Sequence, residues 1–225
     1  MELHLFSANE ADEDLRVVLE ACRDLLRDHA SDAVVAYMPL GSLVTTRRIE
    51  RTRKLFHNAA AIEPVDSETM DLPTMEAVIR RAALVFIPDG NVYLLNHRLH
   101  LSRIVPYLQK KIHNGLPVIA VGAGAITCGP NILTSDDLNI VPTAHFAGLA
   151  VTPFNLHMHY VDDVQRDAWL APYHTFHENA VILLEDGAHL KIQGKSTTLV
   201  EGAGWCLRAG RDKQRLTLGE PISIH

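Results

Sequence analysis

In the first half of the chain, short apolar runs alternate with amphipathic segments. The apolar runs cover residues 3–6, 33–38, 84–87 and 118–121, and each has the length of a buried strand. Between them, apolar residues recur at helical spacing, as Val18, Cys22 and Leu26 do. The same spacing predicts helices over residues 71–82 and 104–112, and a polar, Arg-rich segment predicts another over residues 45–56. Strands that alternate with helices predict a parallel sheet with helices on both faces.

The pattern changes after Asn139. Residues 181–184, 189–192 and 198–200 form short β-like runs, and an acidic or amide residue followed by glycine closes each of them. We expect antiparallel strands here that extend the same sheet. The chain contains no Pro/Ser-rich linker and no repeat, so residues 1–225 are predicted to form one domain. The predicted fold class is α/β, a mostly parallel doubly wound sheet with an antiparallel C-terminal extension.

The stretch from Leu116 to Ile126 has the pattern of a nucleophile elbow. Its apolar run, Val118 to Val121, ends in a turn of small residues and gives way to the start of a helix. Such a turn normally carries Ser or Cys at its apex, but the residue here is Gly122. The turn at Gly90 also follows a predicted strand. Both turns should therefore lie at the carboxyl end of the sheet and face one crevice.

Composition and charge narrow the function classes. The chain has 225 residues, 47% of them hydrophobic and 21% charged, with a net charge of −6. This balance argues against a nucleic-acid or anionic-membrane binder. No stretch approaches the roughly 18 apolar residues that a membrane span needs. The three cysteines form no CxxC pair, and the first residues lack a signal-peptide pattern, so we expect a cytoplasmic protein.

One local run is basic. It consists of Arg47, Arg48, Arg51, Arg53 and Lys54. We interpret it as the solvated face of a helix, and an anion site is the less favoured alternative.

Several stretches, taken in order, resemble the dipeptidase E (aspartyl dipeptidase) and cyanophycinase family of serine peptidases. Residues 85–95 resemble its strand-GGGN-helix motif, with Pro88 and Asp89 in place of the first two glycines. Residues 118–125 resemble its elbow, and residues 129–141 the segment after it. Residues 154–157 resemble its Asn-Pro-His stretch, and residues 184–194 its C-terminal strands. The ordered set favours a degenerate peptidase over a chain that was never catalytic.

The resemblance implies a fold related to class I glutamine amidotransferases, and it assigns roles to particular residues. Position 122 would carry the serine, and His157 would be the base that activates it. His159 is the alternative, although the spacing from Asn155 favours His157. The two candidates for the acid that orients the histidine are Asp137 and Asp186. The oxyanion and ligand-binding positions would be Gly90, Asn91 and Ala123.

Glycine has no side chain, so acyl transfer from position 122 is excluded, whether Gly122 is natural or engineered. Asp89 would also place negative charge near the oxyanion site, which is unfavourable for acyl transfer. Our first hypothesis is a relative that lacks serine-peptidase activity. It would keep a cleft for a small peptide or acidic molecule, or assemble with a partner, and a homo-oligomer is compatible with the sequence.

The second hypothesis is an active peptidase or amide hydrolase. Its substitute nucleophile would be Cys128 or Thr127, or a histidine or a metal ion would activate water. The metal candidates are His157, His159, His174, His177, Asp162 and Asp163. No tight metal-binding signature occurs among them, so we predict neither a metal nor a cofactor.

Overall fold

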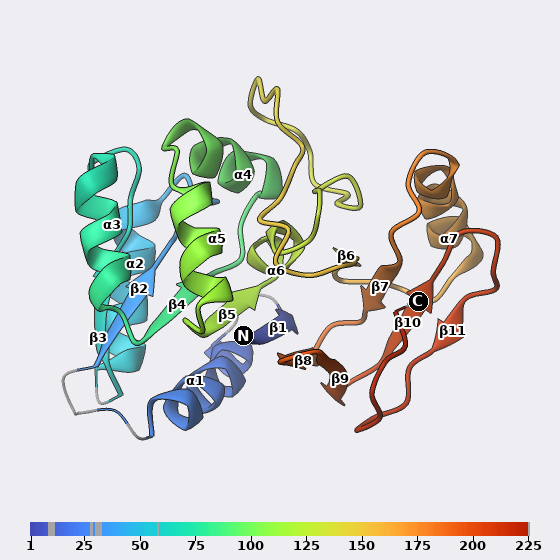
Figure 1. The fold of residues 1–225 in the computed structure, drawn as a ribbon, viewed down its shortest axis with the longest axis horizontal. Coiled ribbons are helices and arrows are strands. Elements are labelled where there is room, and N and C mark those ends of the chain that lie inside the picture. The colour runs from blue at the N-terminus through green and yellow to red at the C-terminus, as the bar shows by residue number, and fades with distance from the viewer. Residues whose placement is uncertain (9–11, 28, 30–32, 58, 225) are drawn as a thin grey trace.

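A seven-stranded sheet forms the centre of the molecule in a computed structural model that describes residues 1–8, 12–27, 29, 33–57 and 59–224 (Figure 1). Its strand order is β3-β2-β4-β5-β1-β8-β9. The first five strands in that order are parallel. They are β3 (Ala61–Pro64), β2 (Val34–Tyr37), β4 (Leu84–Ile87), β5 (Val118–Val121) and β1 (Glu2–Ser7). The two antiparallel strands at the end are β8 (Ala188–Gln193) and β9 (Ser196–Glu201).

Helices cover both faces of this sheet, because alternate residues of each strand point to opposite sides. In β5, Val118 and Ala120 belong to the core cluster formed with α3, α4, α5 and α6, whereas Ile119 and Val121 belong to the cluster formed with α1 and α2. The bounds of these helices are α1 (Asp12–Leu26), α2 (Thr45–Phe56), α3 (Leu72–Arg81), α4 (Val92–Leu101), α5 (Val105–His113) and α6 (Ala123–Thr127). The predicted doubly wound arrangement is confirmed.

The C-terminal strands follow the sequence-based prediction only in part. β8 and β9 extend the main sheet, but β7 (Val181–Leu184) and β10 (Gly204–Leu207) do not. They form a second sheet with β6 (Asn155–His157) and β11 (Gln214–Arg215), in the order β11-β10-β7-β6. Within it, β6 and β7 run parallel.

β7 does not join the main sheet beside β1 because a strand has two edges and can pair with two neighbours. One edge of β1 is taken by β5 and the other by β8, so no edge remains for β7. The turn between β7 and β8 separates the two strands at Gly187, which has a φ of +82° and donates its N–H to the Ser7 carbonyl at 2.7 Å. Periodicity predicts each strand but carries no information about this competition.

One face of the second sheet packs on the main core, since Leu156, Ile182 and Leu184 share a cluster with residues of β1 and β5. The opposite face is covered by helix α7 (Val164–Leu170) and a 3₁₀ helix (Ala171–Thr175) that follows it. Asp163 begins α7 by accepting the N–H of Arg166 at 2.7 Å. In the described part of the chain, no helix combines the length and apolar character required to cross a membrane.

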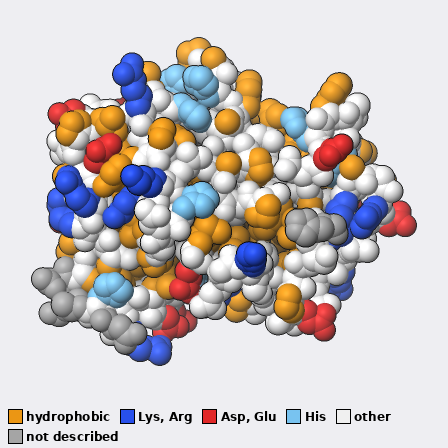
Figure 2. Space-filling model, in the orientation of Figure 1, with side chains coloured by type: hydrophobic (Ala, Val, Ile, Leu, Met, Phe, Trp, Pro, Cys, Tyr) orange, Lys and Arg blue, Asp and Glu red, His pale blue; other side chains and the backbone are white. Residues whose placement is uncertain are grey.

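The basic run lies on α2 but is not simply a solvated face. Lys and Arg side chains gather at the left of Figure 2, over α3 in Figure 1, whereas α2 lies on the opposite face of the sheet. Two members of the run hydrogen-bond backbone carbonyls of other elements. Arg48 donates to the carbonyl of Asp89, and the Nε of Arg53 to the carbonyl of Ile62 at 3.3 Å. The helix is therefore fastened to the sheet through its cations.

Two histidines meet across the β1–β8 pair. The Nδ1 of His4 lies 3.1 Å from the Nε2 of His189, and Phe6 stacks on His189 with ring centroids 4.1 Å apart. Burial lowers the pKa of His189 to about 3, and the neighbouring His4 and Lys191 act in the same direction. Burial also lowers the pKa of His4.

We expect the free energy of unfolding to fall as the pH drops below about 6.5, the pKa of an unfolded histidine. The reason is that both histidines bind protons in the unfolded chain, whereas in the folded protein they stay neutral. Between pH 7 and pH 5, His189 alone should cost about 2 kcal/mol of the free energy of unfolding. Urea denaturation at both pH values measures this. The substitution His189→Gln should flatten the decline, whereas His113→Gln, at an exposed helix position, should not. An equal decline in all three proteins would contradict the assignment.

Candidate active site

Gly122 lies at the apex of the turn between β5 and α6. Its φ of +51° and ψ of −115° are a conformation that glycine adopts most easily. The N–H of Gly122 donates to the Phe6 carbonyl at 2.9 Å, which fixes the apex against the end of β1. Two residues on, a Cβ at Gly124 would lie 2.2 Å from the carbonyl oxygen of Ile87, so only glycine fits there. The backbone therefore has the elbow geometry that the sequence predicts.

The carboxylate of Asp89 occupies the space where the elbow's side chain would start. A Cβ built on Gly122 would lie 2.0 Å from Asp89 Oδ1. The same oxygen accepts the N–H of Ala123 at 2.9 Å. Ala123 is an expected oxyanion donor, so Asp89 both fills the nucleophile's place and engages one group that would stabilise an oxyanion.

The backbone around Asp89 is held from two sides. Arg48 donates to the Asp89 carbonyl. On the other side, a Cβ at Gly90 would lie 2.6 Å from the carbonyl oxygen of Gly41, so the two backbones approach as closely as glycine allows. The N–H of Asn91 donates to that same Gly41 carbonyl at 2.9 Å. Asp89 is therefore presented by a fixed turn.

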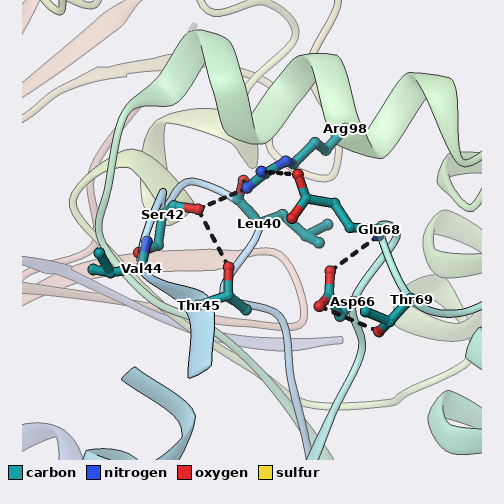
Figure 3. A network of polar contacts seen from close by, with 8 residues as sticks. All are labelled: Leu40, Ser42, Val44, Thr45, Asp66, Glu68, Thr69 and Arg98. Atoms are coloured by element: carbon teal, nitrogen blue, oxygen red, sulfur yellow. Dashed lines mark hydrogen bonds and ion pairs between the residues drawn. The ribbon is translucent and has the colours of Figure 1, made fainter. Parts of the chain in front are cut away.

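Arg98 of α4 in turn fixes the loop that contains Gly41 (Figure 3). Its buried guanidinium donates to the carbonyls of Leu40 at 2.9 Å and Ser42 at 2.7 Å, and it pairs with Glu68. A buried charge is tolerated when it is paired and hydrogen-bonded in this way. The network therefore supports the turn of Asp89 through Gly41 without contacting the site itself.

Asn91 has a structural role rather than the expected ligand-binding one. Its Oδ1 accepts the N–H of Leu94 at 3.0 Å and so caps α4. Its Nδ2 donates to the carbonyl of Leu138 at 2.9 Å. Both ends of the side-chain amide are thus engaged within the protein.

Asp137 lies next to Asp89, at the start of α4. Its Oδ2 accepts the N–H of Val92 at 2.6 Å. Burial raises the pKa of the Asp137 carboxyl, and the charges of Asp89 and Asp136 raise it further. Asp137 contacts no histidine at hydrogen-bond distance in the described residues, so it does not orient the base.

The structure pairs Asp186 with His159, not with His157. The Nδ1 of His159 hydrogen-bonds Asp186 Oδ1. The backbone N–H of His159 donates to Ser7 Oγ at 2.9 Å, and its φ of +55° is uncommon for a residue with a side chain. Ser7 directly follows Phe6, which accepts the N–H of Gly122, so His159 and the elbow flank the same end of β1.

The expectation that His157 is the base needs correction. His157 is fully buried, and its Nδ1 lies 2.7 Å from the carbonyl of Thr134. Its Nε2 has no partner among the described residues. Burial lowers its pKa, and its ring lies beside Trp169 with centroids 5.7 Å apart. Neither candidate acid contacts it.

The substitute nucleophiles are equally inaccessible. Cys128 is fully buried, and burial raises the pKa of its thiol to about 12. The hydroxyl of Thr127 is also buried and donates to the Gly124 carbonyl at 2.7 Å. Neither side chain can reach a substrate at the apex.

The metal candidates do not converge. Within the described parts of the chain, no three His, Cys, Asp or Glu side chains could hold a metal ion together. Asp163 caps α7, and Asp162 pairs with Lys213 at 2.5 Å. His177 stacks on Tyr173, with ring centroids 4.5 Å apart.

Comparison with known proteins identifies the family. Residues 3–200 match the sequence profile of Peptidase family S51. This chain belongs to family S51. Peptidase E from Nostoc sp. is 27% identical to it over 195 residues, which cover 80% of this chain and 78% of that protein. A Drosophila melanogaster protein named "Probable alpha-aspartyl dipeptidase" is 27% identical over 137 residues, 57% of each chain.

The fold of this S51 protein also matches solved structures. A peptidase from an acI-B1 Actinobacterium superposes with a TM-score of 0.75 and 18% identity, covering 99% of this chain and 96% of that one. The family resemblance and the mostly parallel fold are thus confirmed. Sequence reasoning missed Ser7, and it assigned Arg48 only to a solvated helix face, although both residues hold the site's backbone.

We expect Gly122→Ser to lower the free energy of unfolding by about 1–3 kcal/mol, because the new side chain must displace Asp89 from the Ala123 N–H. In an Asp89→Ala background the cost should shrink, with a coupling energy of about 0.5–3 kcal/mol. Urea denaturation of the four proteins measures it. Gly194→Ser is the matched control, since Gly194 has a φ of +63° and nothing lies within 4 Å of its added Cβ. A Gly122→Ser cost that is the same in both backgrounds would contradict the steric account.

Proposed function

We propose that this S51 protein is a peptidase E-like homologue without serine-peptidase activity, and that it keeps a cleft for a small peptide. The observation that carries the proposal is the position of Asp89. Its carboxylate stands where the serine would be and takes the N–H of Ala123. Activity is thus blocked by a missing hydroxyl, an occupied oxyanion donor and a negative charge at the point where an oxyanion would form.

The rest of the constellation supports a retained cleft. His159 is paired with Asp186 and only partly buried, so its ring faces the solvent side of the site. Asp89 and Asp137 are also only partly buried. Their carboxylates suit a peptide, whose α-ammonium they attract, better than a purely acidic molecule.

The test is hydrolysis of the dipeptide Asp-Leu by four proteins. The unmodified protein and Gly122→Ser should both be inactive, since the single change leaves Asp89 in place. The double variant Asp89→Gly, Gly122→Ser restores the nucleophile and frees Ala123, and it should exceed the unmodified protein by at least about 10³-fold in turnover. Adding His159→Gln to the double variant should abolish this gain.

Adding His157→Gln instead should leave turnover largely unchanged, because His157 is fully buried. Cleavage by the unmodified protein at the rate of the double variant would overturn the proposal. A silent double variant that is folded by circular dichroism would contradict the retained cleft.

A further inference from the structure

A cavity of about 510 Å³ lies at one end of the second sheet. It is bounded by residue 153 before β6, by residues 178–180 before β7 and by residues 208, 209 and 211 after β10. These segments meet at one edge of the sheet, because β6 and β7 run parallel and β10 runs antiparallel to β7. His159 follows the opposite end of β6, and none of the residues that line the cavity belongs to the candidate active site. The volume is within the range of small-molecule sites.

A tight turn after β10 brings two arginines to this cavity. The N–H of Arg211 donates to the carbonyl of Arg208 at 3.3 Å, which closes a four-residue turn. Gly210, the third residue of the turn, has a φ of +66°, which glycine adopts easily. The first and last α carbons of a β-turn lie within about 7 Å of each other. Arg208 and Arg211 therefore line the cavity side by side.

Neither arginine has a carboxylate partner in the described part of the chain. Nη1 of the partly buried Arg208 donates to Gln214 Oε1 at 2.8 Å, and its Nη2 donates to the Ser223 carbonyl, so both acceptors are uncharged. Its Nε is buried and has no hydrogen-bond partner there. The side chain of Arg211 is exposed and makes no hydrogen bond or ion pair with the described residues. A partly buried cation with an unmet donor and no counter-ion is unfavourable, so an anion in the adjacent cavity would stabilise it.

The other lining residues select the kind of anion. A guanidinium group pairs in a bidentate manner with either a carboxylate or a phosphate. The carboxylate of Glu178 lines the same cavity and would repel a doubly charged phosphate more strongly than a singly charged carboxylate. The remaining lining residues, most of them apolar, are Pro153, Asn179, Ala180, Ala209 and Ile224. They offer a surface for the hydrocarbon part of an organic acid.

A second hollow of about 300 Å³ borders the same two arginines but does not suit an anion. Asp167 and Asp212 also line it, and their two negative charges balance those of the two guanidinium groups. The larger cavity has the same two guanidinium groups and the single carboxylate of Glu178, so its lining is positive. The larger cavity is therefore the better place for an anion.

We propose that the cavity of about 510 Å³ is a binding site for a small organic monocarboxylate, held by Arg208 and Arg211. The carboxylate pairs with the two guanidinium groups, and the apolar part of the molecule packs on Pro153 and Ile224. A free carboxylic acid and the C-terminus of a peptide share this chemistry. The site goes beyond the proposed function and does not depend on it, because it includes no residue of the elbow.

The experiment is a titration of the isotope-labelled full-length protein with N-acetyl-leucine, followed through its amide resonances by NMR. We expect saturable shifts of the resonances of residues 178–180 and 208–211. N-acetyl-leucinamide has nearly the same shape without the charge, and it should bind at least about 10-fold more weakly. N-acetyl-alanyl-leucine distinguishes the two sources of the carboxylate. If it binds more tightly than N-acetyl-leucine, the site takes the C-terminus of a peptide, and otherwise it takes a free acid.

The variant Arg211→Gln should weaken the binding of N-acetyl-leucine by at least about 10-fold. It should keep the melting temperature of the unmodified protein, because the Arg211 side chain makes no hydrogen bond or ion pair with the described residues. The matched control is Arg80→Gln, at the exposed end of α3, and it should bind as the unmodified protein does.

Four results would overturn the inference. They are the absence of saturable shifts, equal binding of the acid and its amide, an Arg211→Gln variant that binds as tightly as the unmodified protein, and inorganic phosphate that binds the same residues more tightly than N-acetyl-leucine. Shifts confined to Gly122 and Ala123 would also contradict it, because the acid would then occupy the elbow. The dipeptide assay reads the restored serine and the titration reads the arginines, so either proposal can fail without the other.

Discussion

The hydrogen bond between Asp89 Oδ1 and the Ala123 N–H organises the candidate site. It joins two turns that follow neighbouring parallel strands, β4 and β5, at the carboxyl end of the sheet. In a parallel sheet this edge collects the N-termini of the following helices and is where ligands gather. A carboxylate built into the protein occupies that position here. Every other feature of the site has to be understood in relation to it.

Asp89 and Gly122 depend on each other. Any side chain at position 122 would start within 2.0 Å of Asp89 Oδ1, so the two positions cannot both carry their groups in the observed geometry. The pair therefore behaves as one unit, and reversing either residue alone leaves a clash or an empty place. Arg48 and Gly41 hold the backbone of this unit, and the buried Arg98 holds the loop that contains Gly41.

The sequence predicts most of the fold, because each strand and helix has its own periodicity. It predicts the elbow and the adjacent Gly90 turn for the same reason. The second sheet could not be predicted, since it follows from both edges of β1 being taken. The sequence also could not predict which histidine, His157 or His159, pairs with an acid. In an ideal strand His157 and His159 point to the same side, but β6 ends at His157 and the positive φ of His159 turns its ring towards Asp186.

That positive φ has a physical cost of about 1–3 kcal/mol for a residue with a side chain. The hydrogen bond from His159 N–H to Ser7 Oγ and the pairing with Asp186 offset it. Ser7 is fully buried, and its hydroxyl also donates to the Leu184 carbonyl. A polar side chain in the core therefore stabilises the positive φ of His159. The strained histidine, His159, and the elbow that holds the Asp89 carboxylate are connected through β1, because they hydrogen-bond its adjacent residues Ser7 and Phe6. What distinguishes this site from a serine elbow is therefore the identity of the group at the apex, while Asp186 orients the imidazole of His159 beside it.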